Sequence, residues 1–529
     1  MSSEKVQVAK AAGIIGSATL ASRLMGYARD MVMSWAFGTG LAADAFYVAY
    51  RIPNLLRELL AEGSMSAAFI PVFTETLTKE SKESARHLAN AVFARLMVIL
   101  AVLTLLGIIF APFVVKAIAL GFKGDPDKYA TTVALTRIMF PYLLFIGLAA
   151  LAMGILNSLR SFLAPALSPV MLNVMTISSV LLSIWLLPNP IYGVAVGVVV
   201  GGLFQFLIQV PGLKKQGMMM RPEFQPSHPG VAKIGRLALP IMLSSSVTQV
   251  NIFVSTILAS FLATGSITYL FYGMRFIHFP LGIFGIAIAT AVLPTMSAQA
   301  ARGETESFRE TLSLGLRLVF FIMFPAMAGL IVLRVPIVNL LLEHGQFDRI
   351  STAGTAAAIL YYSIGLWAFA GVRIVAQAFY SLQDTKTPVK IAALAMVTNI
   401  LLSIILMGPL AHGGLALATS LAAMLNIGLL TWQLRKKIGR MDGRRILASL
   451  LRIIPVSAAM GAIGWWVSRN TVWELRGNTL YKSELLAGTM VVSVLFYGFM
   501  MWVLRSEELK FIWGMVKRKK GSRGKGQEA

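Results

Sequence analysis

The chain of 529 residues is 57% hydrophobic and only 13% charged, whereas soluble domains carry about 25% charged residues. Apolar stretches of about 18 residues or more recur along it, each long enough to cross a hydrocarbon core of ~30 Å. The absence of cysteine excludes disulfides, thiolate catalysis and cysteine-ligated metals. These features predict an all-α, polytopic membrane protein, because helices satisfy their own backbone groups in lipid.

Fourteen transmembrane helices are predicted in chain order. They span roughly residues 11–37, 41–75, 88–115, 130–157, 163–187, 191–212, 233–262, 266–298, 311–341, 353–381, 388–409, 413–434, 446–468 and 483–504. The start, MSSEKVQVAK, lacks an apolar core followed by a small-residue cleavage site, so we expect the first helix to be retained.

The net charge of +24 would also suit a nucleic-acid-binding protein, but its distribution does not. Alternating the loops between the two sides of a membrane puts Lys and Arg on one side by roughly four to one, including the tail KRKKGSRGKG at 517–526. The opposite side of the membrane carries few cations, and Lys128 is predicted to lie in one of its loops. Positive loops face the cytoplasm, so we expect both termini there and no nucleic-acid partner.

An internal repeat relates two parts of the chain. NSLRSFLAP at 157–165 matches YSLQDTKTP at 380–388 at an offset of 223, and the segments at 193–217 and 414–439 match at 221. Six predicted helices separate the copies, which implies two parallel six-helix bundles with a central cavity, as in many transporters. The expected parts are an N-terminal lobe at 1–217, a C-terminal lobe at 218–440, two additional helices at 441–505 and a basic cytoplasmic tail at 506–529.

The second predicted helix contains ADAFYVAYRIPNLLRELLAEG at 43–63, which is unusually charged for a membrane span. At 100° per residue its polar side chains fall within an arc of roughly 140°, opposite an apolar face. The polar set comprises Asp44, Tyr47, Arg51, Asn54, Arg57, Glu58 and Glu62. Such an arc must face protein or water. Two alternatives remain. Arg57 could snorkel to the membrane interface, or internal ion pairs could join Arg51 with Glu58 or Arg57 with Glu62.

Further arginines lie within other predicted spans. Arg23 shares a helical face with Asp30, and Arg29 follows Gly26 on the same helix. In the eighth span Tyr272, Arg275 and His278 recur at three-residue spacing, and Arg373 lies in the tenth span. A cavity with this excess of guanidinium groups predicts a phosphate- or carboxylate-bearing substrate, although chloride binding and structural pairing remain alternatives.

Several motifs resemble signatures of the bacterial lipid II flippase family (MurJ, also called MviN), within the multidrug/oligosaccharidyl-lipid/polysaccharide exporter superfamily. They are SRLMGYARD (22–30), FGTGLAADAFYVAYRIPNLLRELLAEGSMSAAFIPVF (37–73), FPLGIFGIAIATAVLPTMS (279–297), FYSLQDTKTPVKIA (379–392) and HGGLALATSLAAMLNIGLLTWQLRKK (412–437). The resemblance implies a transporter, not an enzyme, that moves the undecaprenyl-diphosphate-linked peptidoglycan precursor from the inner to the outer leaflet of the bacterial cytoplasmic (inner) membrane.

The resemblance also implies roles for individual residues. The family's cavity arginines fall on Arg23, Arg29, Arg57 and Arg275, with Arg373 at the position of a frequent lysine. The family's helix-borne acids fall on Asp30, Asp44 and Glu62. From their helical positions, further polar supports are expected at Arg51, Asn54, Glu58 and His278. The chain departs from the family at Met274 and His278, where relatives carry Asp and Glu, so the expected cavity is more cationic.

Alternating access is the mechanism that the resemblance and the repeat imply. Hinge candidates are Gly26, Pro53, Gly63, Pro280 and Gly282. We expect the last two helices to form a groove for the lipid tail, no cofactor or metal, and coupling to the membrane potential or to Na⁺, H⁺ or Cl⁻. Cell-wall synthesis proteins are candidate partners.

Three other functions are alternatives, of which a channel is not favoured by the two-bundle repeat. An exporter of the same superfamily would carry drugs or another polyprenyl-linked oligosaccharide. A membrane enzyme acting on lipid phosphates would need clustered carboxylates or spaced histidines, and the sequence has neither pattern.

Overall fold

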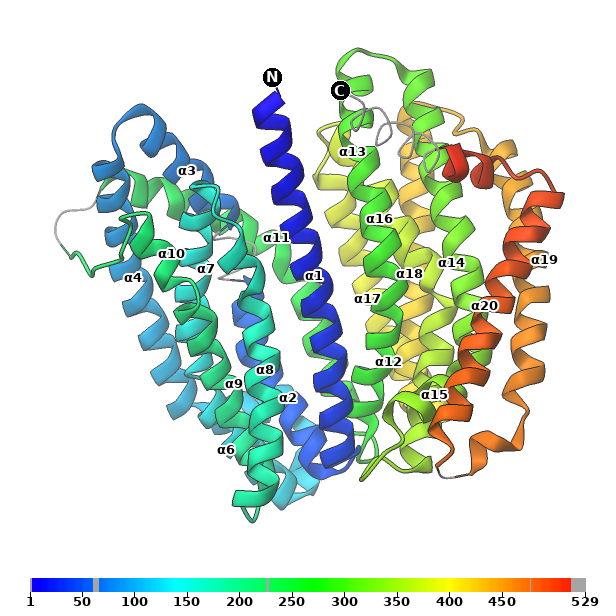
Figure 1. The fold of residues 1–529 in the computed structure, drawn as a ribbon, viewed down its shortest axis with the longest axis horizontal. Coiled ribbons are helices and arrows are strands. Elements are labelled where there is room, and N and C mark those ends of the chain that lie inside the picture. Colours follow the sequence, from blue (N-terminus) through cyan, green and yellow to red (C-terminus); the bar gives the residue numbers. More distant parts are fainter. Residues whose placement is uncertain (1, 60–65, 225–227, 476, 515–529) are drawn as a thin grey trace. The chain divides into compact units, whose positions relative to one another are not determined.

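A computed structural model describes residues 2–59, 66–224, 228–475 and 477–514, and its regular elements there are all helical (Figure 1). The chain forms two compact units. Unit 1 consists of Met1–Thr268 and His344–Asp348, and unit 2 of Tyr269–Glu343 and Arg349–Ala529. Unit 1 therefore includes a helix beyond 217/218, where the repeat predicts the lobes to divide. The two units are defined by packing, whereas the lobes were predicted from the sequence repeat. The predicted lobe boundaries therefore stay a prediction.

Unit 1 contains eleven of the α-helices and the start of a twelfth among the described residues. They are α1 (Ser2–Phe37), α2 (Leu41–Arg57), α3 (Ser66–Lys79), α4 (Lys82–Ile109), α5 (Ala111–Ile118), the 3₁₀ turn η2 (Leu120–Gly124), α6 (Pro126–Met139), α7 (Tyr142–Ser158), α8 (Leu163–Leu186), α9 (Pro190–Leu207), α10 (Val210–Lys215), α11 (Pro229–Ser260) and α12 (Ser266–Pro280).

Local sequence signals set where several of these helices begin. Ser81 caps α4 by accepting a hydrogen bond from the amide of Ser84. Asp125 caps α6 in the same way, and Pro126 follows at the first helical position, where its missing N–H costs nothing. Helices α3, α4 and α7 then bury a shared core that includes Phe69 and Leu88.

Unit 2 continues from α12 through a π-helical turn. Its further elements are η3 (Leu281–Gly285), α13 (Ile286–Ala301), α14 (Thr305–Leu342), α15 (Arg349–Ile364), α16 (Leu366–Ser381), α17 (Lys386–Leu410), α18 (His412–Ile438), α19 (Gly443–Ser468), η4 (Thr471–Glu474) and α20 (Thr479–Val503). The π turn follows Pro280, which removes a backbone donor from the helical ladder. Two hinge candidates, Pro280 and Gly282, thus lie at this irregularity, whereas Gly63 lies outside the described residues.

Helices α19 and α20 pack on the rest of unit 2. Gly461 and Gly464 of α19 lie against α14, where a Cβ at either position would make ordinary van der Waals contact with side chains of α14 at 3.5 to 3.7 Å. Lys482, in the first turn of α20, donates to Oδ1 of Asn339 on α14 at 2.8 Å and to the carbonyl of Leu475 at 2.7 Å. Glycine packing and a buried amine therefore attach these two helices to α14.

Among the described residues, ten helices are long and apolar enough to cross a membrane, or eleven if the pair α15 and α16, bent by 42°, counts as one. The predicted class, an all-α multi-pass membrane protein, is confirmed at this level. The remaining predicted spans fall on α1, on α2 with α3, and on α11. Helix α1 carries charged residues, and α2 and α3 are two separate helices. Among the described residues of α11, Gln249–Ser260 forms a shorter apolar helix.

Candidate substrate-binding site and its polar supports

Three of the predicted substrate-binding arginines belong to unit 1. Arg23 and Arg29 lie on α1, and Arg57 is the last residue of α2. The Arg29 guanidinium contacts the carboxylate of its neighbour Asp30 through Nη2 at 2.7 Å and Nε at 3.1 Å, and Asp30 is buried. Charge-assisted contacts of this kind fix both side chains. Arg29 and Asp30, both expected at the site, therefore form one pair.

A second network lies at the carboxyl end of α2. Arg57 Nε donates to Oδ1 of Asn54 at 3.0 Å, and Asn54 Nδ2 donates to Oε1 of Glu58 at 3.1 Å. Arg57 Nη2 also lies 3.7 Å from Oε1 of Glu58. Spacings of three and four residues place these side chains on one helical face. The sequence analysis left open two internal ion pairs, Arg51 with Glu58 and Arg57 with Glu62. The structure shows Glu58 beside Arg57, while Glu62 lies outside the described residues.

Gln249 of α11 completes this network and was missed by the sequence analysis. Its Nε2 donates to Oε2 of Glu58 at 2.6 Å, and its side chain is buried. A hydrogen bond to an ionised carboxylate is stronger than one between neutral groups. Gln249 therefore attaches α11 to the end of α2 within unit 1. A neutral glutamine in an apolar helix carries no charge signal that would have identified it.

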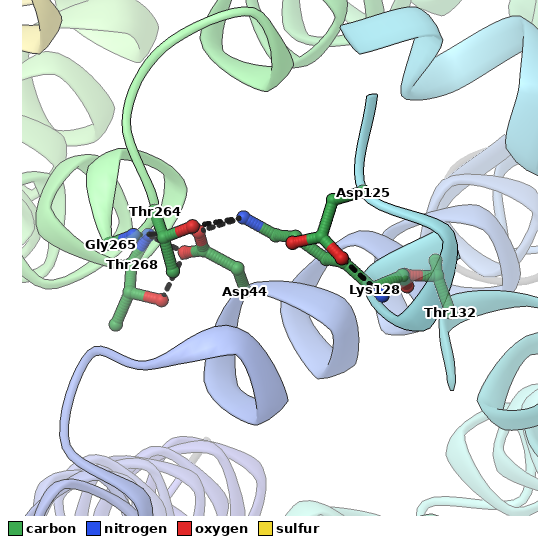
Figure 2. A network of polar contacts seen from close by, with 7 residues as sticks. All are labelled: Asp44, Asp125, Lys128, Thr132, Thr264, Gly265 and Thr268. Carbon is green, nitrogen blue, oxygen red and sulfur yellow. Dashed lines mark hydrogen bonds and ion pairs between the residues drawn. The ribbon is translucent and has the colours of Figure 1, made fainter. Parts of the chain in front are cut away.

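Asp44, near the start of α2, accepts hydrogen bonds from four donors (Figure 2). Oδ2 accepts from Lys128 Nζ and from the amide of Gly265, both at 2.8 Å. Oδ1 accepts from the amide of Thr268 at 3.0 Å and from its hydroxyl at 2.7 Å. Because the Asp44 side chain is 1% exposed, these four bonds replace the water that an ionised carboxylate requires. Asp44, expected as a cavity support, thus joins α2, α6 and the α11–α12 turn.

The prediction that Lys128 lies in a loop is wrong. It is in the first turn of α6, and its side chain is only 5% exposed. Besides Asp44, its ammonium lies 3.4 Å from Thr264 Oγ1 and 4.4 Å from the centre of the Phe122 ring. Hydropathy predicted a loop here, because a lysine that follows two aspartates and a proline is typical of an exposed segment. The charge of Asp44, 84 residues away, provides the reason for its burial.

The remaining predicted cations belong to unit 2. Arg275 lies half-buried on α12, next to the buried Tyr272, and His278 is exposed one turn further along. Arg373 is exposed on α16. The structure thus divides the expected cations into an α1–α2 group in unit 1 and an α12–α16 group in unit 2. In the described part of the chain no three His, Asp or Glu side chains gather as metal ligands would.

Comparisons with known proteins identify close similarities over most of the chain. Residues 33–481 match the family model described as "Lipid II flippase MurJ". A "Probable lipid II flippase MurJ" of Vibrio cholerae serotype O1 is 40% identical over 473 residues, covering 87% of this chain and 90% of that protein. A "Lipid II flippase MurJ" of Burkholderia cenocepacia is 35% identical over 491 residues, covering 92% and 95% respectively.

Solved structures give the same grouping. A structure described as "Lipid II flippase MurJ, inward closed conformation" matches with a TM-score of 0.77 and 26% identity, over 93% of this chain and 99% of that one. An inward-facing multidrug resistance transporter of the MATE family matches with a TM-score of 0.67 at 15% identity, over 82% and 99%. The second similarity is one of fold alone.

Proposed function

Because the chain belongs to the lipid II flippase MurJ family, we propose that it moves lipid II from the inner to the outer leaflet of the bacterial cytoplasmic membrane. The observation that carries this proposal is the match of residues 33–481 to the family, together with curated relatives that bear the same name along nearly their whole length. The family is one of transporters, so the chain is classed with flippases and not with enzymes.

The substrate of a lipid II flippase carries a diphosphate, and guanidinium groups suit such a ligand. Arginine presents several donors in a planar fork that matches phosphate oxygens. We assign binding of the diphosphate to Arg23, Arg29, Arg57 and Arg275, with Arg373 in support. Asn54 accepts a hydrogen bond from Arg57, and the Glu58 carboxylate lies 3.7 Å from the guanidinium, which supports a prearranged guanidinium on α2.

The number and arrangement of the transmembrane helices belong to the same proposal. Counting the bent pair α15 and α16 as one span gives eleven apolar spans, and adding α1, the α2–α3 segment and α11 gives the fourteen transmembrane helices of the sequence prediction. Charged residues on α1 and α2 lower their hydropathy, which is the expected cost of carrying the site on membrane helices. Two parallel six-helix repeats, two additional helices and cytoplasmic termini complete the arrangement.

In this proposal, transport proceeds by alternating access of the two repeats. Binding energy alone cannot drive net transport, so a second source must reset the protein. The membrane potential contributes ~2.3 kcal/mol per charge per 100 mV, and the arginines supply charges on which it can act. Movement of Na⁺, H⁺ or Cl⁻ is the alternative source. Helices α19 and α20 are assigned to the polyprenyl tail, and cell-wall synthesis proteins remain candidate partners.

Complementation tests the proposal against its alternative. The chain is expressed in cells depleted of their own lipid II flippase, with the Vibrio cholerae relative as positive control. Restored growth without lysis is the expected result. If the relative restores growth and this chain, at equal abundance, does not, the proposal fails. Reduced accumulation of cationic drugs by the same cells would then favour a drug exporter of the superfamily.

A further inference from the structure

Two amide donors hold the carboxylate of Glu58 at the end of α2. Oε1 accepts a hydrogen bond from Asn54 Nδ2 at 3.1 Å, and Oε2 accepts one from Gln249 Nε2 at 2.6 Å. Each carboxylate oxygen is thus satisfied by a neutral side chain. Helix α2 changes here into a π-helical turn at residues 58–59, an irregularity that is frequent at functional sites.

Arg57 and Arg29 approach their neighbouring carboxylates differently. Arg29 contacts Asp30 directly, with Nη2 at 2.7 Å and Nε at 3.1 Å from the same oxygen. Arg57 Nη2 instead lies 3.7 Å from Oε1 of Glu58, which is beyond hydrogen-bond distance, and Arg57 Nε donates to Asn54 at 3.0 Å. Glu58 therefore lies beside the Arg57 guanidinium without accepting a hydrogen bond from it.

Gln249 on α11 is suited to hold the Glu58 carboxylate in this orientation. Gln249 is only 9% exposed, and a hydrogen bond to an ionised carboxylate is about twice as strong as one between neutral groups. The Glu58 side chain is 37% exposed, so water could replace Gln249 as a donor but would not fix the carboxylate. A mobile carboxylate would turn towards the guanidinium 3.7 Å away and form a direct salt bridge with it.

We propose that Gln249 is a positioning residue for Arg57. By holding Glu58, it keeps this carboxylate from competing for the guanidinium that binds the diphosphate of the substrate. Carboxylate and phosphate oxygens match the same donors of a guanidinium, so a direct salt bridge to Glu58 would have to break before phosphate could bind. This role rests on the proposed function, because it concerns how the lipid II diphosphate is bound.

Replacing Gln249 by leucine should therefore weaken the binding of lipid II. Binding is measured on the full-length protein in lipid nanodiscs, by titration with a fluorescent lipid II. We expect Gln249→Leu to raise the dissociation constant about fivefold, somewhat less than the loss of one direct charged hydrogen bond. In the Glu58→Ala background the same substitution should change the dissociation constant no further, because the residue through which Gln249 acts is absent.

Gln209→Leu is the matched control for a loss of stability. Gln209 is a buried glutamine of the same unit, and its Nε2 donates to the carbonyls of Ala149 and Gln205 at 3.0 and 2.9 Å, not to a charged group. Its replacement should lower the melting temperature at least as much as Gln249→Leu does. The dissociation constant for lipid II should nevertheless stay at the wild-type value.

Arg57→Ala separates a failure of the positioning role from a failure of the proposed function. If Arg57→Ala weakens binding and Gln249→Leu does not, the positioning role is wrong and the substrate assignment stands. Equal weakening by Gln249→Leu in the wild-type and Glu58→Ala backgrounds would also overturn the role, because Gln249 would then act without Glu58. If Arg57→Ala binds lipid II as tightly as wild type, the diphosphate assignment fails, and the role of Gln249 fails with it.

Discussion

Asp44 and Lys128 illustrate, at the scale of single residues, how a charge among membrane helices can stabilise a fold. Both side chains are buried, and Asp44 has three further donors from Gly265 and Thr268. Removing one member of a buried ion pair leaves an uncompensated charge, at a cost of ~3–5 kcal/mol. The carboxylate is therefore the more costly member to remove, because its loss also leaves two backbone amides without an acceptor.

We expect Asp44→Ala to lower the thermal stability of the detergent-purified protein more than Lys128→Met. The first variant should lose ~3–5 kcal/mol. The second should lose less than the first, because three hydrogen bonds still satisfy the Asp44 carboxylate. Glu75→Gln is the control, since Glu75 pairs with Lys79 and Lys233 at the surface, where pairs contribute ~0–1 kcal/mol. Equal effects of Asp44→Ala and Glu75→Gln would contradict a buried structural network.

Glu508 allows a second test at this scale through pH. Burial by itself would raise the pKa of Glu508, but hydrogen bonds from Ser506 and Ser449 and the charge of Arg317 together hold that pKa below its usual range. A depressed carboxyl pKa stabilises the fold above the unfolded value of ~4.3, and this contribution is lost as the pH falls through the folded pKa.

The stability gap between wild type and Glu508→Gln should therefore be largest above pH 5 and shrink towards pH 3. Melting temperatures measured across this range give the gap. Glu507→Gln is a matched control, because Glu507 contacts the same arginine but is 65% exposed. A gap that does not change with pH would show that Glu508 is not ionised in the folded protein.

Turns illustrate, at the scale of elements, what the sequence can and cannot predict. Apolar runs predicted the order of the helices, and the glycine pair FGTG between α1 and α2 marks a turn. In the structure Gly38 has φ of +56°, and a Cβ there would lie 2.3 Å from the carbonyl oxygen of Gln346. Gln346 also donates its amide to the carbonyl of Trp35 at 2.9 Å. No local pattern predicts that Gly38 and Gln346, which are far apart in the sequence, share this turn.

Gly38→Ala should destabilise unit 1 by more than its left-handed backbone alone would cost. That conformation costs a residue with a Cβ ~1–2 kcal/mol, and the clash with Gln346 adds to it. Gly303→Ala is the control, because Gly303 has φ of +72° with nothing near its Cβ position. We expect a melting temperature clearly lower for Gly38→Ala than for Gly303→Ala. Equal melting temperatures would mean that the turn can move away from Gln346.

The candidate site was predictable in part, for a physical reason. Polar residues at helical spacing on an apolar background predicted that Arg57, Asn54 and Glu58 share one face of α2, and their mutual hydrogen bonds confirm this, because the spacing depends only on local sequence. Partners from distant helices were not predictable. Gln249 is neutral. Lys128 has the sequence pattern of a loop residue, and only its contact with Asp44 explains its burial.

Orientation is a property of the whole molecule, and the excess of loop cations predicts it. The cysteine-free chain permits a direct test by labelling single cysteines with a membrane-impermeant thiol reagent. Asn478→Cys, before α20, should react in intact cells. Ser522→Cys, in the tail, should react only after permeabilisation. The reverse pattern would place the termini outside the cytoplasm.

The central claim is that arginines of both units act on lipid II, and its exposure in the outer leaflet measures this most directly. In cells with this protein as their only flippase, a periplasmic lipid II-cleaving toxin reports the exposed pool. We predict that Arg57→Ala and Arg275→Ala reduce cleavage about tenfold or more at equal protein and total lipid II, as loss of a charged hydrogen bond of ~1.5–3 kcal/mol implies. Arg302→Ala, which removes an exposed partner of Glu304, should match wild type. Unchanged cleavage in both site variants would contradict the account.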